Sequence, residues 1–239
     1  MTCLWKALGA LLLVWGILGS GGAARAATIA IDATDSGWYD DGGSHDMNND
    51  NYLVGWRGAE YHNYFVFDLT SIASETVVSA TLRLFEPAVD LPTIYADGYD
   101  SPDPSETYEV VQVITPAAAL IPSGFLATPI YDDLGDGTVF GTRAISAADN
   151  GTNVDVVLNA AAVSAIDSAV GLFALGGHIT TLTRGFDSEF AFGSTSAASL
   201  RQLVIETTAV PEPASGALVS LGLLAIAARR RNGGLRPSG

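Results

Sequence analysis

The sequence predicts an all-β protein, an antiparallel two-sheet sandwich of jelly-roll type, and three observations lead to this fold class. Apolar residues between positions 28 and 208 recur with a period of two, which is typical of strands with one buried face. Glycine, asparagine and aspartate separate these runs and supply the backbone conformations that tight turns require. About ten such runs joined by long polar loops are typical of a sandwich.

The strand and helix predictions follow from local patterns. Alternation is strongest in the runs at 64–69, 78–85, 154–158 and 203–205, and weaker runs predict strands at 28–32, 52–56, 108–114, 139–146, 171–179 and 189–193. Short helices are expected at 116–120 and 160–169, and Asn150-Gly151 predicts a β-hairpin. A β-helix is the alternative fold, but the sequence has no repeat of fixed period that would support it.

The first 26 residues have the layout of a secretory signal peptide. Lys6 precedes an apolar segment at 7–18, and small residues then lead to the motif Ala24-Arg25-Ala26. Because signal peptidase cleaves after such a motif, we expect a signal peptide at 1–26 and a mature chain that begins at Ala27. An N-terminal anchor that is not removed is the alternative.

A short apolar segment lies near the other end of the chain. Residues 214–228 carry no charge, and as a helix they would be roughly 22 Å long, against a hydrocarbon core of ~30 Å. Three arginines follow at 229–231, and arginines at this position stay on the cytoplasmic side and reach towards the lipid headgroups. The pattern predicts a short transmembrane helix at 214–228 and a cytoplasmic tail at 232–239. A buried core helix is the alternative.

Two prolines, Pro211 and Pro213, precede this segment and mark the end of the folded domain. The order of Pro-Glu-Pro, apolar run and arginine cluster resembles the PEP-CTERM sorting signal of exported bacterial proteins, here at residues 210–231. The resemblance assigns recognition to Pro211, Glu212 and Pro213 and the stop to Arg229, Arg230 and Arg231. It implies processing by an exosortase-type membrane enzyme. It also implies export to the cell envelope, surface or extracellular matrix of a Gram-negative bacterium that makes exopolysaccharide.

Residues 27–209 then form a single predicted β-sandwich domain with a strongly acidic composition. This stretch holds 25 acidic residues, five arginines and no lysine, which gives a formal net charge of −20. Binding to nucleic acid is excluded, because phosphates need a basic surface. The single cysteine, Cys3, lies in the predicted signal peptide, so a disulfide framework is excluded as well. An acidic surface is compatible with divalent cations, with a neutral polysaccharide, or with solubility alone.

A second resemblance concerns the first half of this domain. An aspartate-rich loop is followed by Asn-Tyr-Leu-Val-Gly at 51–55, by Asn-Tyr-Phe-Val-Phe-Asp-Leu at 63–69 and by Val-Ser-Ala-Thr-Leu-Arg-Leu at 78–84. This order is similar to the opening half of DNRLRE-type sandwich domains, which are exported modules associated with polysaccharide binding. The chain departs from that pattern at Asn63, where those domains usually have an arginine. The resemblance implies an extracellular polysaccharide as partner.

The aspartate-rich loop at 35–50 is a candidate calcium site. Calcium takes roughly six to eight oxygen ligands from flexible loops, and the candidate ligands are Asp40, Asp41, Asp46 and Asp50. The spacing is not that of an EF-hand. A solvated acidic loop without a metal is the alternative.

Aromatic residues in the predicted loops are candidates for ligand binding. Sugar rings stack on exposed aromatic faces, and the candidates are Trp38, Tyr39 and Tyr99. Trp56 and Tyr61, by contrast, are expected to cap the core.

Catalytic patterns are scarce in this sequence. The three histidines lie far apart in the chain, and there is neither a G-x-S-x-G motif nor zinc-ligand spacing. We therefore expect a non-catalytic exported protein that binds or coats extracellular polysaccharide. The alternatives are a structural or adhesive surface protein without a glycan ligand, and a polysaccharide-cleaving enzyme.

Overall fold

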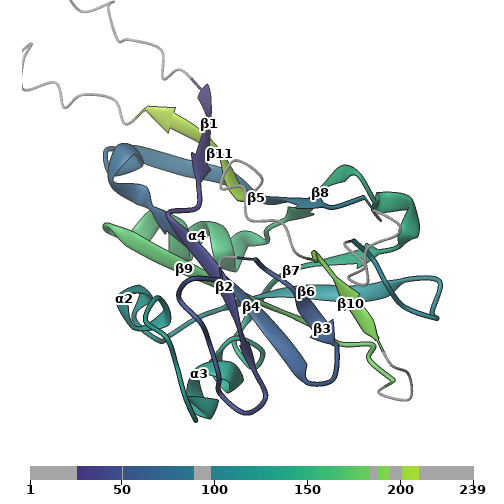
Figure 1. Cartoon of the computed structure of the whole chain (residues 1–239). Coiled ribbons are helices and arrows are strands. Elements are labelled where there is room, and N and C mark those ends of the chain that lie inside the picture. Colours follow the sequence, from purple (N-terminus) through teal and green to yellow (C-terminus); the bar gives the residue numbers. More distant parts are fainter. Residues whose placement is uncertain (1–25, 50, 89–97, 184–187, 194–200, 210–239) are drawn as a thin grey trace, which may run out of the picture. The chain divides into compact units, whose positions relative to one another are not determined.

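The computed structural model describes residues 26–49, 51–88, 98–183, 188–193 and 201–209. Residues Ala26–Thr208 form one compact unit that is mostly β, with two sheets and few helices (Figure 1), as the sequence predicts. Apart from Ala26, the predicted signal peptide and the predicted transmembrane segment at 214–228 lie outside the described residues. Within those residues, no helix has the length and apolar character that crossing a membrane requires.

The smaller sheet has four strands in the order β1-β11-β5-β8. Their bounds are Ala26–Asp32 (β1), Arg201–Ala209 (β11), Glu75–Glu86 (β5) and Thr152–Val157 (β8). The first and last strands of the unit are antiparallel neighbours, with Ala26 opposite Thr208. β5 and β8 are also antiparallel, with Leu84 opposite Val154.

The larger sheet has seven strands, six of them in the order β10-β3-β4-β9-β6-β7, while β2 pairs with β4. Their bounds are Asp35–Asp40 (β2), Val54–Trp56 (β3), Glu60–Asp68 (β4), Glu106–Gln112 (β6), Val139–Ile145 (β7), Leu172–Ile179 (β9) and Glu189–Ala191 (β10). Two 3-10 helices, Leu69–Ile72 (η1) and Ala147–Asp149 (η2), lie in the connections. Along the chain, β4 and β5 belong to different sheets, as do β7 and β8, and β8 and β9.

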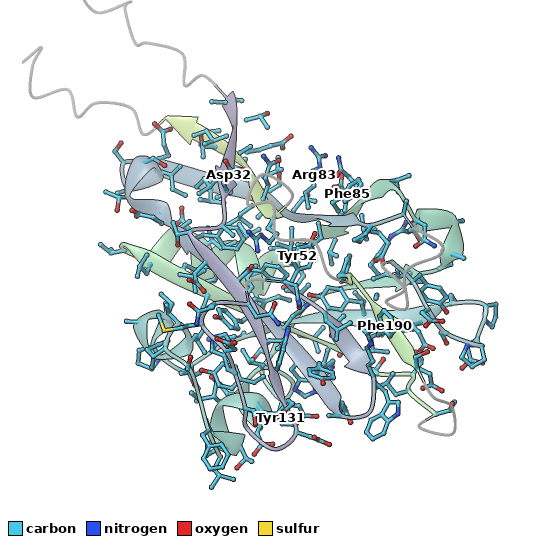
Figure 2. All side chains as sticks on the ribbon, in the orientation of Figure 1. Asp32, Tyr52, Arg83, Phe85, Tyr131 and Phe190 are labelled. Atoms are coloured by element: carbon cyan, nitrogen blue, oxygen red, sulfur yellow. The ribbon has the colours of Figure 1, made fainter. Side chains whose placement is uncertain are left out.

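The main core fills the space between the sheets, where Figure 2 shows Tyr52. It consists of every second residue along several strands, those whose side chains face inward, for example Phe65, Phe67, Leu82, Leu84, Val154, Val156, Leu203 and Ile205. Helix α4 (Ala160–Ser168) packs against β5 and closes one side of this core. It begins where the sequence predicts, because the Asn159 side chain accepts hydrogen bonds from Ala161 N and Ala162 N.

The outer face of the larger sheet is covered as well. Helices α2 (Ala117–Leu120) and α3 (Thr128–Asp133) lie over it, with α2 against β9 and α3 against β2 (Figure 1). A second apolar cluster forms underneath from Tyr39, Tyr64, Val66, Leu120, Leu134 and Ala174. Strand β4 is therefore buried on both faces, which explains why residues 64–67 form a continuous apolar run without alternation. Gly176 permits the close approach, since a Cβ there would lie 2.8 Å from Leu134 O.

The structure differs from the sequence predictions in three places. Residues 35–40 form strand β2 instead of loop, because the backbone finds hydrogen-bonding partners on β4 that override its polar composition. Helix α3 has no predicted counterpart. The turn at Asn150-Gly151 joins β7 to β8 with Gly151 at φ +74°, but these strands belong to different sheets, so the expected hairpin is wrong.

Candidate functional site

Strands β2, β3 and β4 bring a set of aromatic and polar side chains to one face of the larger sheet. In the β2–β4 register Trp38 lies opposite Asn63, and Asp40 lies opposite Tyr61. Since side chains alternate along a strand, Trp38, Asp40 and Tyr61 share a face. That face is the inner one, because Asn63 bonds within the core to Tyr108 and to the Tyr52 carbonyl.

Trp38 and Tyr61 are in direct ring contact. Their ring centroids are 4.8 Å apart and the rings meet edge to face at 84°, which is a favourable geometry for an aromatic pair. Trp38 Nε1 donates a hydrogen bond of 2.7 Å to Asn51 Oδ1, which fixes the orientation of the indole. Both aromatic side chains are half-buried, so each rests on the sheet and retains accessible surface.

Charged groups flank the two rings. Burial, followed by the negative charge of Asp40, raises the pKa of Tyr61, while Arg57 acts in the opposite direction. The Arg57 guanidinium lies over the Phe190 ring, 5.4 Å from its centroid (Phe190 is labelled in Figure 2). We call Trp38, Asp40, Asn51, Arg57 and Tyr61 the aromatic patch. It combines ring surface with a carboxylate, an amide and a guanidinium, which together can contact the C–H groups and the hydroxyls of a sugar.

The other two predicted ligand-binding aromatics lie in the interior. Tyr39 is on strand β2 and not in a loop, its side chain is fully buried, and its hydroxyl donates to Leu120 O at 3.0 Å. Tyr99 is also buried, and its hydroxyl donates to Asp103 O at 2.7 Å. The alternation along β2 explains why Tyr39 and Trp38 face opposite ways. In this conformation neither tyrosine ring offers a face to a ligand.

The predicted calcium ligands lie at the end of β2 and along the chain that follows it. Asp40 Oδ1 accepts a hydrogen bond of 2.7 Å from Ser44 N, and Asp41 is exposed. Asp46 is exposed and its carboxylate accepts from Asn48 N at 3.0 Å, a bond that lowers the pKa of Asp46. Asp50 lies outside the described residues. Where the structure describes the chain, no three His, Cys, Asp or Glu side chains are grouped so that they could hold a metal ion.

Sequence reasoning missed three members of the aromatic patch, Asn51, Arg57 and Tyr61. Tyr61 was expected to cap the core and was not considered as a ligand-binding residue, and the other two carried no signal of their own. A tight turn at Gly58, with φ +77°, brings Arg57 back beside β4. Glycine at 58 could have predicted this hairpin, but not which side chains would meet Trp38 across β2.

The predicted sorting residues at 211–213 and 229–231 lie outside the described residues. The comparison with curated proteins finds no match for this chain. The similarity of residues 51–84 to DNRLRE-type domains stays a prediction. A comparison with family models finds the PEP-CTERM protein-sorting motif at residues 209–231. Such motifs are substrates of exosortase-type processing. The chain therefore carries a PEP-CTERM sorting motif, which implies an exported protein associated with the cell envelope.

Proposed function

We propose that this exported protein is non-catalytic and binds extracellular polysaccharide through the aromatic patch. The observation that carries the proposal is the contact between Trp38 and Tyr61, two half-buried rings held edge to face beside Asp40 and Asn51. Most other large aromatic side chains of the described residues are fully buried in the two cores. A fixed ring pair that keeps accessible surface is the arrangement that a pyranose ring can stack on.

The charge of the domain favours a neutral or weakly charged polymer. Residues 27–209 have a net formal charge of −20 without a single lysine, which repels a polyanionic glycan. Asp40, Asn51 and Arg57 can still form directional hydrogen bonds with sugar hydroxyls, because such bonds do not need opposite charges.

The finer assignments of fold and routing belong to the same proposal. The strand orders β1-β11-β5-β8 and β4-β9-β6-β7, with the crossings between sheets, support a jelly-roll topology. Residues 1–26 act as signal peptide, and 214–228 span the inner membrane of a Gram-negative bacterium until an exosortase-type enzyme processes the tail.

Affinity electrophoresis of the full-length chain in mild detergent tests glycan binding. The gels contain the exopolysaccharide of the producing organism, with calcium or with a chelator. We expect retardation that Trp38→Ala abolishes and Trp38→Phe retains in part, because phenylalanine keeps a stacking face but loses the bond to Asn51. Trp56→Ala is the matched control, since Trp56 is also half-buried but points to the opposite face of the sheet from Tyr61.

The outcomes separate the alternatives. Equal mobility with and without polysaccharide would refute glycan binding and favour a structural or adhesive surface protein. Retardation that is present with calcium and lost with the chelator would assign calcium a role in binding. Release of reducing sugar from the polymer would show that the protein is a polysaccharide-cleaving enzyme.

A further inference from the structure

Two histidines far apart in the sequence are neighbours on the outer face of the larger sheet. His62 is on β4 and His178 is on β9. These strands are antiparallel neighbours with Asn63 opposite Gly177, so the two histidines lie next to each other one position further along. The same row continues to β6, where Glu109 lies directly opposite His178. The two imidazole centroids are 5.4 Å apart. We call His62 and His178 the histidine pair.

The segment that contains α3 covers the histidine pair. The Tyr131 ring stacks on His62 with centroids 4.0 Å apart and an angle of 8°, and His62 Nδ1 donates to Tyr131 O at 2.8 Å. Tyr131 is labelled in Figure 2. The backbone at Gly135 lies against both rings, since a Cβ there would be 2.3 Å from His62 Cε1 and 2.8 Å from His178 Nδ1. Any larger movement of either ring therefore requires residues 128–137 to move.

The histidine pair has little access to water. The side chain of His62 is 10% exposed and that of His178 is 17% exposed. Burial lowers the pKa of both groups, and the proximity of His62 lowers that of His178 further. A protonated pair would place two charges side by side in a poorly hydrated site, which is unfavourable.

Acidic groups face the pair from each neighbouring element, and none is close enough to cancel this cost. Glu60 Oε1 on β4 is 3.5 Å from His62 Nε2, and Glu109 Oε2 on β6 is 3.5 Å from His178 Nε2. Both distances exceed those of a good hydrogen bond. The remaining groups are Asp41 after β2, Asp132 in α3 and Asp136 after α3, which act on His62 at longer range.

We propose that the histidine pair is an acid-sensitive latch that holds residues 128–137 on the sheet at neutral pH and releases them when both imidazoles are protonated. Release lets both charges reach water. It also uncovers the apolar cluster beneath α3, whose members on the sheet include Tyr39, Tyr64 and Val66. The outer face of the sheet thereby becomes an apolar surface that is available only under acidic conditions.

The direction of the pH dependence follows from the lowered pKa values of His62 and His178. The latch contributes its full stability above the ordinary histidine pKa of about 6.5. That contribution is lost as the pH falls below this value, because the open segment binds protons that the closed one excludes.

Amide hydrogen exchange of the full-length chain in mild detergent tests the latch. After correction for intrinsic exchange, we expect residues 128–137 to lose protection by roughly tenfold between about pH 7.5 and about pH 5, while core strands such as β5 keep theirs. A loss of the same size throughout the sandwich, or none at all, overturns the proposal.

Two substitutions shift the transition in opposite directions. His178→Asn removes one of the two charges, so residues 128–137 should stay protected at lower pH. Glu109→Gln removes the carboxylate that faces His178 and should move opening to higher pH. Glu206→Gln, on β11 of the other sheet, is the control and should change nothing.

The histidine NMR titration of the unsubstituted protein does not depend on any variant being folded. We expect two coupled steps, both below the ordinary pKa. Two independent titrations at the ordinary value would overturn the proposal.

Discussion

Glu86 should make the stability of the sandwich decrease as the pH rises above the acidic range. This residue ends β5 and its side chain is fully buried. Glu86 Oε1 accepts a hydrogen bond of 3.0 Å from Phe192 N, whereas Oε2 has no partner within the described part of the chain. Burial raises the pKa of Glu86 from 4.5 to about 8. The folded protein thus holds the carboxyl in its protonated form at neutral pH.

The size of the effect follows from this difference. The pKa of Glu86 is 4.5 in the unfolded chain and about 8 in the folded protein. Between these two pH values the free energy of unfolding falls by about 1.36 kcal/mol for each pH unit, which amounts to about 5 kcal/mol in total. The stability is fully present below pH 4.5 and is lost as the pH rises through about 8, because the folded state binds the proton more tightly than the unfolded chain.

Glu86→Gln isolates this contribution. Glutamine keeps the acceptor for Phe192 N but cannot ionise, so the unfolding free energy from urea titrations should hardly change from about pH 7 to about pH 9. At about pH 9 the variant should be more stable than the unsubstituted protein by about 3–5 kcal/mol. Glu206→Gln, at an exposed carboxylate, is the matched control and should keep the unsubstituted slope. A Glu86→Gln protein whose stability follows the unsubstituted curve would refute the reasoning.

Three further substitutions, at two positions, test the core and the loop before α3. Tyr108→Phe removes the hydroxyl that donates a buried hydrogen bond of 2.9 Å to Asn63 Oδ1. The substitution should lower the unfolding free energy by about 1–3 kcal/mol. A loss below about 0.5 kcal/mol would show that the Asn63 amide finds another partner. Leu126 is exposed and has φ +58°, a left-handed conformation that asparagine adopts more easily than leucine and that a β-branched residue adopts least easily. In thermal melts, Leu126→Asn should therefore stabilise the protein by about 0.5–1 kcal/mol and Leu126→Val should destabilise it. Equal melting temperatures for these two variants would contradict the assigned strain.

Part of the candidate site could be predicted from the sequence. Trp38 and Asp40 were singled out as an aromatic and a carboxylate in a polar stretch, and both belong to the aromatic patch. Tyr39 carries the same local signal, yet it is buried because α2 supplies an acceptor for its hydroxyl about eighty residues later in the chain. The alternation along a strand predicts which face of the sheet a residue lies on. It does not predict which other element covers that face.

The sequence by itself determined the β-rich class, most strand positions, the acidic charge and the sorting tail. These properties depend on period, composition and contiguous motifs, which a linear chain displays directly. Only the tertiary structure decided that β2 is a strand, that α2 and α3 cover the outer face, and that His62 meets His178. Such contacts join residues that are distant in sequence, and alternation gives the face of each side chain but not its partner across the sheet.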